Sequence, residues 1–137
     1  MKMVGFLAKH EKRILGTAFG YDRADEHQSR ITEESKGDIL RYLAAGKYIF
    51  GMTLAIEDES GKYISPYIVY GDDEWLWPAY LSYYIESGRL VELPGEFLEH
   101  ITKNNFEFPE ITIGQEETAK KFFMTLLSEN NQNGQKK

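Results

Sequence analysis

The stretch "KYIFGMTLAIEDESGKYISPYIVYGDDEWLWP", residues 47–78, decides the fold. Over residues 48–57, bulky side chains alternate with a second set along the chain: Tyr48, Phe50, Met52, Leu54 and Ile56 against Ile49, Gly51, Thr53, Ala55 and Glu57. A period of two over ten residues predicts a strand with one bulky and one small face. The segment "EDESGK" supplies a turn in which Gly61 can take a positive φ. We therefore expect 47–57 and 62–70 to pair as an antiparallel hairpin.

The end of this stretch predicts a corner between sheet and helix. Trp75 and Trp77 fall on the same face of a short third strand. Pro78 follows where a helix can begin, because the first helical residue needs no N–H donor. Apolar residues then recur at helical spacing, so we expect the Trp rings to fill the wedge between the two elements. Pro66 cannot donate to a sheet ladder and marks the second hairpin strand as an edge or bulged strand.

The remaining segments add helices around the hairpin. Ser35 and Asp38 resemble a capping box and predict a helix over 36–45. Pro94 precedes a short amphipathic helix, and a last helix near 115 carries one apolar stripe: Ala119, Phe122, Phe123, Leu126 and Leu127. The pattern of residues 1–20 predicts two short strands and not one poor helix. Residues 21–34 are predicted as an exposed loop, and residues 111–113 as a strand. The fold class is α+β: an antiparallel sheet, made of the central hairpin and a short third strand, packed by three to four helices.

Length and composition point to one domain. The chain has 137 residues, 42% hydrophobic and 14% aromatic, which is enough to build one core. Residues 129–137, "ENNQNGQKK", offer nothing to bury, so we expect a domain over 1–128 and a disordered tail over 129–137. The absence of Cys fits a reducing cytoplasm. No apolar run reaches the length that crosses a bilayer, and we expect a cytoplasmic protein without a membrane partner.

The charge balance disfavours nucleic acid. The chain has 16 basic and 22 acidic residues, a net charge of −6. This repels a polyanion and suits a cationic protein partner instead. The densest basic group, Lys9, Lys12 and Arg13 around His10, is more typical of a solvated face than of a phosphate site.

The sequence does not indicate an enzyme. His10, His27 and His100 are far apart and belong to no metal-binding pattern, and no nucleophile elbow or phosphate-binding glycine loop is present. The carboxylates of 57–59 and 72–74 could bind a divalent cation or act as acid and base, but turns favour acidic residues for backbone reasons alone. We therefore predict no catalytic residue, no cofactor and no metal ligand.

The aromatic residues beside these acids suggest a binding surface. Tyr rings could stack sugars, but rigid rings among acids are also typical anchors of a protein interface, which needs fewer assumptions. The predicted partner-binding residues are Glu57, Asp58, Glu59, Tyr63, Tyr67, Asp72, Asp73, Glu74 and Trp75. An exposed edge strand could equally serve a homodimer.

Three segments carry a resemblance to other proteins. They are "GDILRYLAAGKYIFG" at 37–51, "YGDDEWLWPAYLSYYIESG" at 70–88 and "LPGEFLEHI" at 93–101. Their order resembles a group of small, largely uncharacterised bacterial proteins in which a "T-D-G-E-W-x-W" segment precedes a Tyr-Tyr helix and an "h-x-x-H-I" segment. Asp73 stands where that group has Gly.

The resemblance implies a non-enzymatic role, because proteins of this size and acidity often serve as immunity partners of secreted bacterial toxins. We therefore expect a protein that covers a cationic toxin domain with an acidic, aromatic surface. The alternative is a small ligand-binding or regulatory domain, which would need a concave pocket lined by the Tyr residues.

Overall fold

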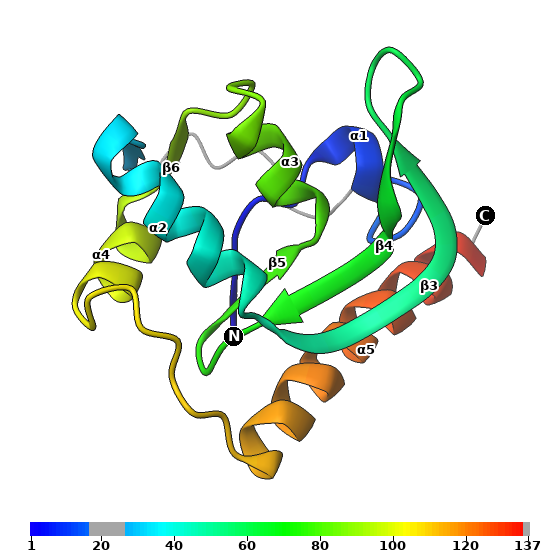
Figure 1. Cartoon of the computed structure of the whole chain (residues 1–137). Helices are drawn as coiled ribbons and strands as arrows, with labels where there is room; N and C mark the ends of the chain where they lie inside the picture. The colour runs from blue at the N-terminus through cyan, green and yellow to red at the C-terminus, as the bar shows by residue number, and fades with distance from the viewer. Residues whose placement is uncertain (17–26, 136–137) are drawn as a thin grey trace.

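A four-stranded sheet forms the centre of the molecule. The computed structural model describes residues 1–16 and 27–135, and side chains up to residue 129. Strands β3 (Lys47–Glu57) and β4 (Tyr63–Gly71) form the predicted antiparallel hairpin, and β4 continues into the antiparallel β5 (Trp75–Pro78). The strand order is β1-β5-β4-β3 (Figure 1). The hairpin and the short third strand are thus confirmed.

The sheet is mixed, whereas the sequence predicts a purely antiparallel one. The chain begins with β1 (Lys2–Met3), which pairs in parallel with β5. After Leu7 it makes one helical turn, α1 (Ala8–Glu11). The prediction of two strands in this region is therefore wrong in its second half, and residues 17–20 lie outside the described residues. A two-residue strand has no periodic pattern of its own, because its partner strand determines it.

Bulges interrupt the alternation of β3. The register between β3 and β4 shifts between Tyr48 and Phe50 and again between Met52 and Ala55. Each irregularity changes which residues face the core. Ile49, expected on the small face, is 4% exposed, while Tyr48 is 52% exposed. The prediction of one continuous bulky face is therefore wrong.

Pro66 lies next to the second of these irregularities, opposite Ala55. The strand β4 is not at the edge of the sheet, because β5 pairs with it. That pairing covers only Val69–Gly71, so Pro66 lies beyond the reach of β5. The extra residues at this irregularity, 53 and 54, belong to β3, whereas the extra residue of β4 itself is Ile64, between Ser65 and Tyr63. The predicted bulge in the strand that contains Pro66 is thus present two residues before this Pro.

A second, smaller sheet and four longer helices complete the fold. Strands β2 (Gln28–Arg30) and β6 (Glu92–Pro94) pair antiparallel. Of the predicted loop over 21–34, residues 21–26 lie outside the described residues, 28–30 form β2 and 33–34 begin a helix. The other helices are α2 (Glu33–Ala44), α3 (Tyr80–Glu86), α4 (Gly95–Thr102) and α5 (Ile113–Gln135). With α1 the described residues thus form five helices, compared with three to four predicted.

Helix α2 begins earlier than the capping-box pattern predicts. Its N-cap is Thr32, whose Oγ1 accepts a hydrogen bond from the Ser35 N–H at 3.1 Å. Ser35 therefore lies inside the first turn, and the helix gains three residues at its start. A Thr at the N-cap accepts a hydrogen bond from one of the unpaired N–H groups of the first turn, as Ser would.

The Trp pair lies at the predicted corner. Trp75 and Trp77 are both buried in one core cluster with α2, α3 and α4, and Leu76 between them belongs to the other cluster. This is the alternation of a strand. The Trp77 Nε1–H donates to the Leu43 carbonyl at 3.3 Å, which joins the corner to α2. The extended chain ends at Pro78 and the helix begins at Tyr80, so the change from strand to helix occurs where the sequence predicts it.

Helix α5 covers the other side of the hairpin. It lies next to β3, whereas α4 lies beside the small sheet of β2 and β6 (Figure 1). Its apolar stripe packs into the core around Phe123, as predicted. Residues 111–113 form no strand, because the helix begins at Ile113. At its other end the helix continues to Gln135, through most of the segment predicted as a disordered tail.

Gly5 offers a test of the link between β1 and α1. Its φ is +80°, and a Cβ there would lie 2.7 Å from the Leu81 side chain. We expect Gly5→Ala to lower the free energy of unfolding by about 1–3 kcal/mol, because the strained backbone and the clash act together. Gly37→Ala, inside α2, is the control, since nothing lies within 4 Å of the added Cβ. This substitution should raise the free energy of unfolding by about 0.5–1 kcal/mol. Urea denaturation measures both, and equal effects would contradict this account.

Candidate functional site

The structure separates the two acidic turns. Residues 57–59 lie at the junction of β3 and β4, whereas 72–74 connect β4 to β5. These junctions are at opposite ends of β4, so the predicted acidic surface is two separate groups. The steering role of these acids stays a prediction.

Burial divides the predicted partner-binding residues further. Tyr67 is 1% exposed and Trp75 is 4% exposed, so both rings belong to the core and the prediction of them as surface anchors is wrong. Asp58 and Asp72 are buried as well. Asp73 is half-buried, and the remaining four residues are exposed: Glu57, Glu59, Tyr63 and Glu74.

Asp58 holds the hairpin turn against α3. Its Oδ1 accepts hydrogen bonds from the backbone N–H groups of Ser60 and Lys62 and from the Ser60 hydroxyl, and its Oδ2 accepts from Tyr83 at 2.7 Å. The hydrogen bonds from Ser60 and Tyr83 hold the pKa of Asp58 well below its ordinary value. Arg89 lies 3.3 Å from the same Oδ2. These bonds are typical of a turn clamp, so Asp58 has a structural role.

Asp72 holds the second turn in a similar way. Its Oδ1 accepts from the backbone N–H groups of Glu74 and Trp75, at 2.8 and 2.7 Å. Its Oδ2 accepts from the Tyr42 hydroxyl at 2.6 Å and lies 2.8 Å from His100 Nε2. One buried carboxylate thus connects this turn to α2 and α4.

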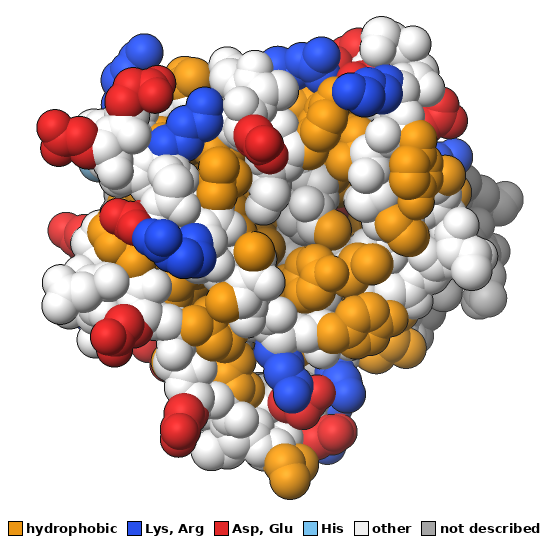
Figure 2. Space-filling view, viewed as in Figure 1, with side chains coloured by type: hydrophobic (Ala, Val, Ile, Leu, Met, Phe, Trp, Pro, Cys, Tyr) orange, Lys and Arg blue, Asp and Glu red, His pale blue; other side chains and the backbone are white. Residues whose placement is uncertain are grey.

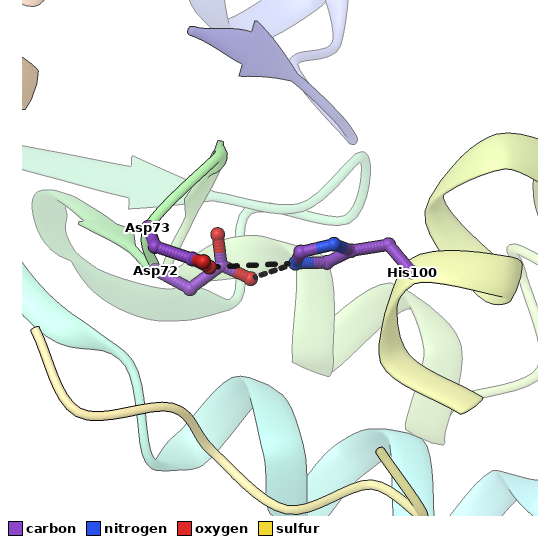
Figure 3. A group of neighbouring side chains, drawn as sticks. All are labelled: Asp72, Asp73 and His100. Atoms are coloured by element: carbon purple, nitrogen blue, oxygen red, sulfur yellow. Dashed lines mark hydrogen bonds and ion pairs between the residues drawn. The ribbon is translucent and has the colours of Figure 1, made fainter. Parts of the chain in front are cut away.

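His100 brings the neighbouring acids into the same cluster. Asp73 Oδ1 lies 3.7 Å from His100 Nε2, and Figure 3 shows this carboxylate beside that of Asp72. Glu74 Oε2 lies 3.4 Å from His100 Nδ1. The His100 side chain is 8% exposed. A groove of about 480 Å³ opens beside it, lined by Lys2, Glu74, Trp75, Glu96, Glu99, His100, Thr102 and Lys103. Imidazole and carboxylates at this spacing can exchange a proton or hold a cation.

A second polar cluster is enclosed in the core. Glu11 of α1 is 0% exposed and accepts hydrogen bonds from the hydroxyls of Tyr67 and Tyr80, at 2.6 and 2.7 Å. Burial raises the pKa of Glu11 to about 7, and the tyrosine hydrogen bonds oppose this only partially. His10 beside it lies 2.8 Å from the Tyr84 hydroxyl, and burial lowers the pKa of this His. Because Glu11 has no exposed surface, a solvent-borne substrate has no access to it in this structure.

A pocket of about 490 Å³ lies near the hairpin turn. Its lining residues are Leu7, Ala8, Lys9, Glu59, Tyr84, Arg89 and Leu90. Both cations are ion-paired, since Lys9 contacts Glu59 and Arg89 lies 3.4 Å from the same Glu. The charged side chains of the pocket thus neutralise one another, and the rest of its lining is mostly apolar.

Exposed hydrophobic residues lie along the length of the hairpin: Tyr48 opposite Tyr70 at one end, Met52 opposite Tyr67, and Tyr63 opposite Glu57 at the turn. Tyr48, Met52 and Tyr63 are 52%, 37% and 57% exposed. Figure 2 shows hydrophobic side chains on the region of this face where β3 and β4 lie. Within the described residues no strand pairs with the outer edge of β3, so eleven residues offer a free edge. The sequence does not identify Tyr48 and Met52 as candidates, because their alternation indicates a buried face.

Comparison with known proteins finds no matching family model, curated protein or solved structure. Among the helices of the described residues, none has both the length and the apolar character needed to cross a membrane.

Proposed function

We propose that this chain is a non-enzymatic binding protein of the immunity type, which neutralises a bacterial toxin domain by covering it with the β3–β4 hairpin. The observation that carries the proposal is the free edge of β3 with three large exposed hydrophobic side chains on the hairpin, Tyr48, Met52 and Tyr63. An open edge offers backbone hydrogen bonds, and aromatic rings beside it offer contact area at low entropic cost.

Electrostatics favours a cationic partner for this surface. The whole chain carries a net charge of −6. Glu57 and Glu59 are exposed at the hairpin turn next to Tyr63. Glu59 is paired with Lys9 and Arg89, so Glu57 is the acid of this turn that raises the association rate of a basic partner, more than it raises the final affinity. The resemblance in the Trp-centred segment supports the same class of protein.

Replacing an anchor tests the proposal. We expect Tyr63→Ala to weaken binding to a toxin domain encoded beside this gene by about thirtyfold or more, the effect of losing an interface hot spot of about 2 kcal/mol. Raising the salt concentration should slow association of the wild type. Surface plasmon resonance on the purified pair measures both effects.

Val91→Ala is the matched control, because Val91 is an exposed hydrophobic residue outside the hairpin. It should leave binding unchanged. Equal losses from both variants, or a neighbouring toxin domain that does not bind, would overturn the proposal.

The free edge could instead pair with β3 of a second copy. Analytical ultracentrifugation separates the two uses, because a homodimer forms without any partner. If the isolated chain is a dimer that Tyr48→Ala dissociates, the hairpin is an oligomer interface.

The apolar pocket lined by Leu7, Tyr84 and Leu90 favours a second candidate, a small ligand-binding domain. Its volume is within the range of ligand sites. In that case a small molecule should raise the melting temperature of the chain, and Leu90→Trp, which fills the pocket, should abolish the increase.

A further inference from the structure

We propose that Asp72, Asp73 and His100 form a binding site for a divalent transition-metal ion, for which Zn²⁺ is the best-matched example. Each residue offers one atom that can bind a metal, a carboxylate oxygen or an imidazole nitrogen. These three atoms lie within 4.8 Å of one another. The proposal is independent of the hairpin surface, because the site shares no residue with Tyr48, Met52 and Tyr63.

The spacing of the three side chains is close to that of ligands around a single ion. Zn²⁺ binds nitrogen and oxygen ligands at about 2.0–2.2 Å, so two ligands of one ion lie about 3–4 Å apart. Asp73 Oδ1 lies 3.7 Å from His100 Nε2, within this range, whereas Asp72 Oδ2 lies 2.8 Å from the same nitrogen, at hydrogen-bond distance, and would move outward when an ion binds. Figure 3 shows both carboxylates turned toward the same edge of the imidazole ring. Small side-chain rotations would admit an ion between the three atoms.

One proposed ligand atom is buried without a hydrogen bond. Asp73 Oδ1 makes none within the described residues; His100 Nδ1 also makes none, but it faces Glu74 Oε2 at 3.4 Å. A buried polar atom without a partner is costly, and in native structures such an atom often indicates an ion or water. The Asp73 oxygen is one of the proposed ligand atoms, so a cation there would satisfy it.

The surrounding charges also favour a cation. Asp72, Asp73 and Glu74 place three carboxylates beside one imidazole, so the group stays negative even with His100 protonated. Glu74 Oε2 lies 3.4 Å from His100 Nδ1, on the far side of the ring from the proposed ion. A carboxylate there can receive the Nδ1–H and leave Nε2 free to bind metal, as second-sphere carboxylates do.

The ligand types select the class of metal. An imidazole nitrogen suits first-row transition ions, whereas Mg²⁺ and Ca²⁺ prefer oxygen ligands alone. The groove beside His100 brings solvent to one side of the cluster, and three acids, Glu74, Glu96 and Glu99, line it together with Lys2 and Lys103. Bound metal would join the β4–β5 turn to α4 more firmly than the hydrogen bond does.

Asp73→Asn tests the site without breaking the fold, because Asp73 makes none of the four hydrogen bonds around Asp72. We expect ZnCl₂ to raise the melting temperature of the full-length chain and to bind with one ion per chain in calorimetry. Asp73→Asn should weaken this binding at least tenfold and leave the metal-free melting temperature nearly unchanged. Mg²⁺ at the same concentration should have no effect.

Asp38→Asn is the control, since Asp38 is an exposed acid of α2 that pairs with Arg41. It should bind Zn²⁺ like the wild type. A second readout is the quenching of Trp fluorescence by Co²⁺, because the Trp75 ring lies 6.4 Å from the His100 ring. Equal Zn²⁺ affinity in Asp73→Asn and wild type, or no binding by the wild type, would overturn the site.

Discussion

Glu11→Gln should stabilise the protein at neutral and basic pH, by about 2 kcal/mol near pH 8. Glu11 has no exposed surface, and burial raises its pKa from an ordinary 4.5 to about 7. A tenfold change in proton affinity corresponds to about 1.4 kcal/mol, so ionising this carboxyl in the folded state costs about 3 kcal/mol more than in the unfolded chain. Glutamine has the shape of the protonated acid and avoids this cost.

The pH dependence follows from the same raised pKa. Between about pH 4.5 and 7 the folded state holds a proton on Glu11 that the unfolded state has released. Stability from this group is therefore fully present below about pH 4.5 and lost as the pH rises to about 7. Glu11→Gln should remove that loss, so the advantage of the variant grows across this range and then stays constant.

Chemical denaturation at several pH values measures the difference. Glu11→Ala is the second variant, and it should destabilise at every pH because it leaves the hydroxyls of Tyr67 and Tyr80 without this acceptor and opens a cavity. A Glu11→Gln variant that is equally destabilised at pH 4.5 and 8 would show that the carboxyl titrates normally in the fold.

The sequence predicts the hairpin well because its information is local. Alternation over 47–57, a turn with Gly61 and a second extended run need no distant partner to be recognised. The Trp corner is predicted for the same reason, since Pro78 marks a change of period. The bulges of β3 are not predicted, because they depend on how β4 pairs with it residue by residue.

The two polar clusters cannot be predicted from local sequence patterns. Glu11 stands in the charged run "KHEKR", where every neighbour suggests solvent, yet one helical turn places it inward while Lys12 and Arg13 stay outside. His100 is 28 residues from Asp72 and belongs to no spacing motif. Composition also cannot tell which aromatic rings are buried, so the sequence favours Tyr67 and Trp75 as anchors where the structure exposes Tyr48. An alternating pattern identifies a face, and only packing shows which face is covered.

Asp72→Ala should lower the free energy of unfolding by about 3–4 kcal/mol, one of the largest losses from a single substitution in this chain. The carboxylate is buried and accepts from Tyr42, Glu74 N–H and Trp75 N–H, with His100 as its fourth neighbour. Removing a shared acceptor leaves several buried donors unsatisfied, and each costs about 1–3 kcal/mol with some relief from relaxation. Thermal unfolding followed by near-UV circular dichroism measures the loss through the two Trp rings.

Two further variants separate the network from the charge. Tyr42→Phe deletes one of the donors to Asp72, and we expect a loss of about 1 kcal/mol. Asp73 is on the same turn but makes none of these hydrogen bonds, so Asp73→Asn should lower the free energy of unfolding by less than about 0.5 kcal/mol. If Asp72→Ala and Asp73→Asn lowered stability equally, the turn would depend on its total negative charge. A large gap between them instead assigns the stability to the directed hydrogen bonds that join the Trp corner to α2 and α4.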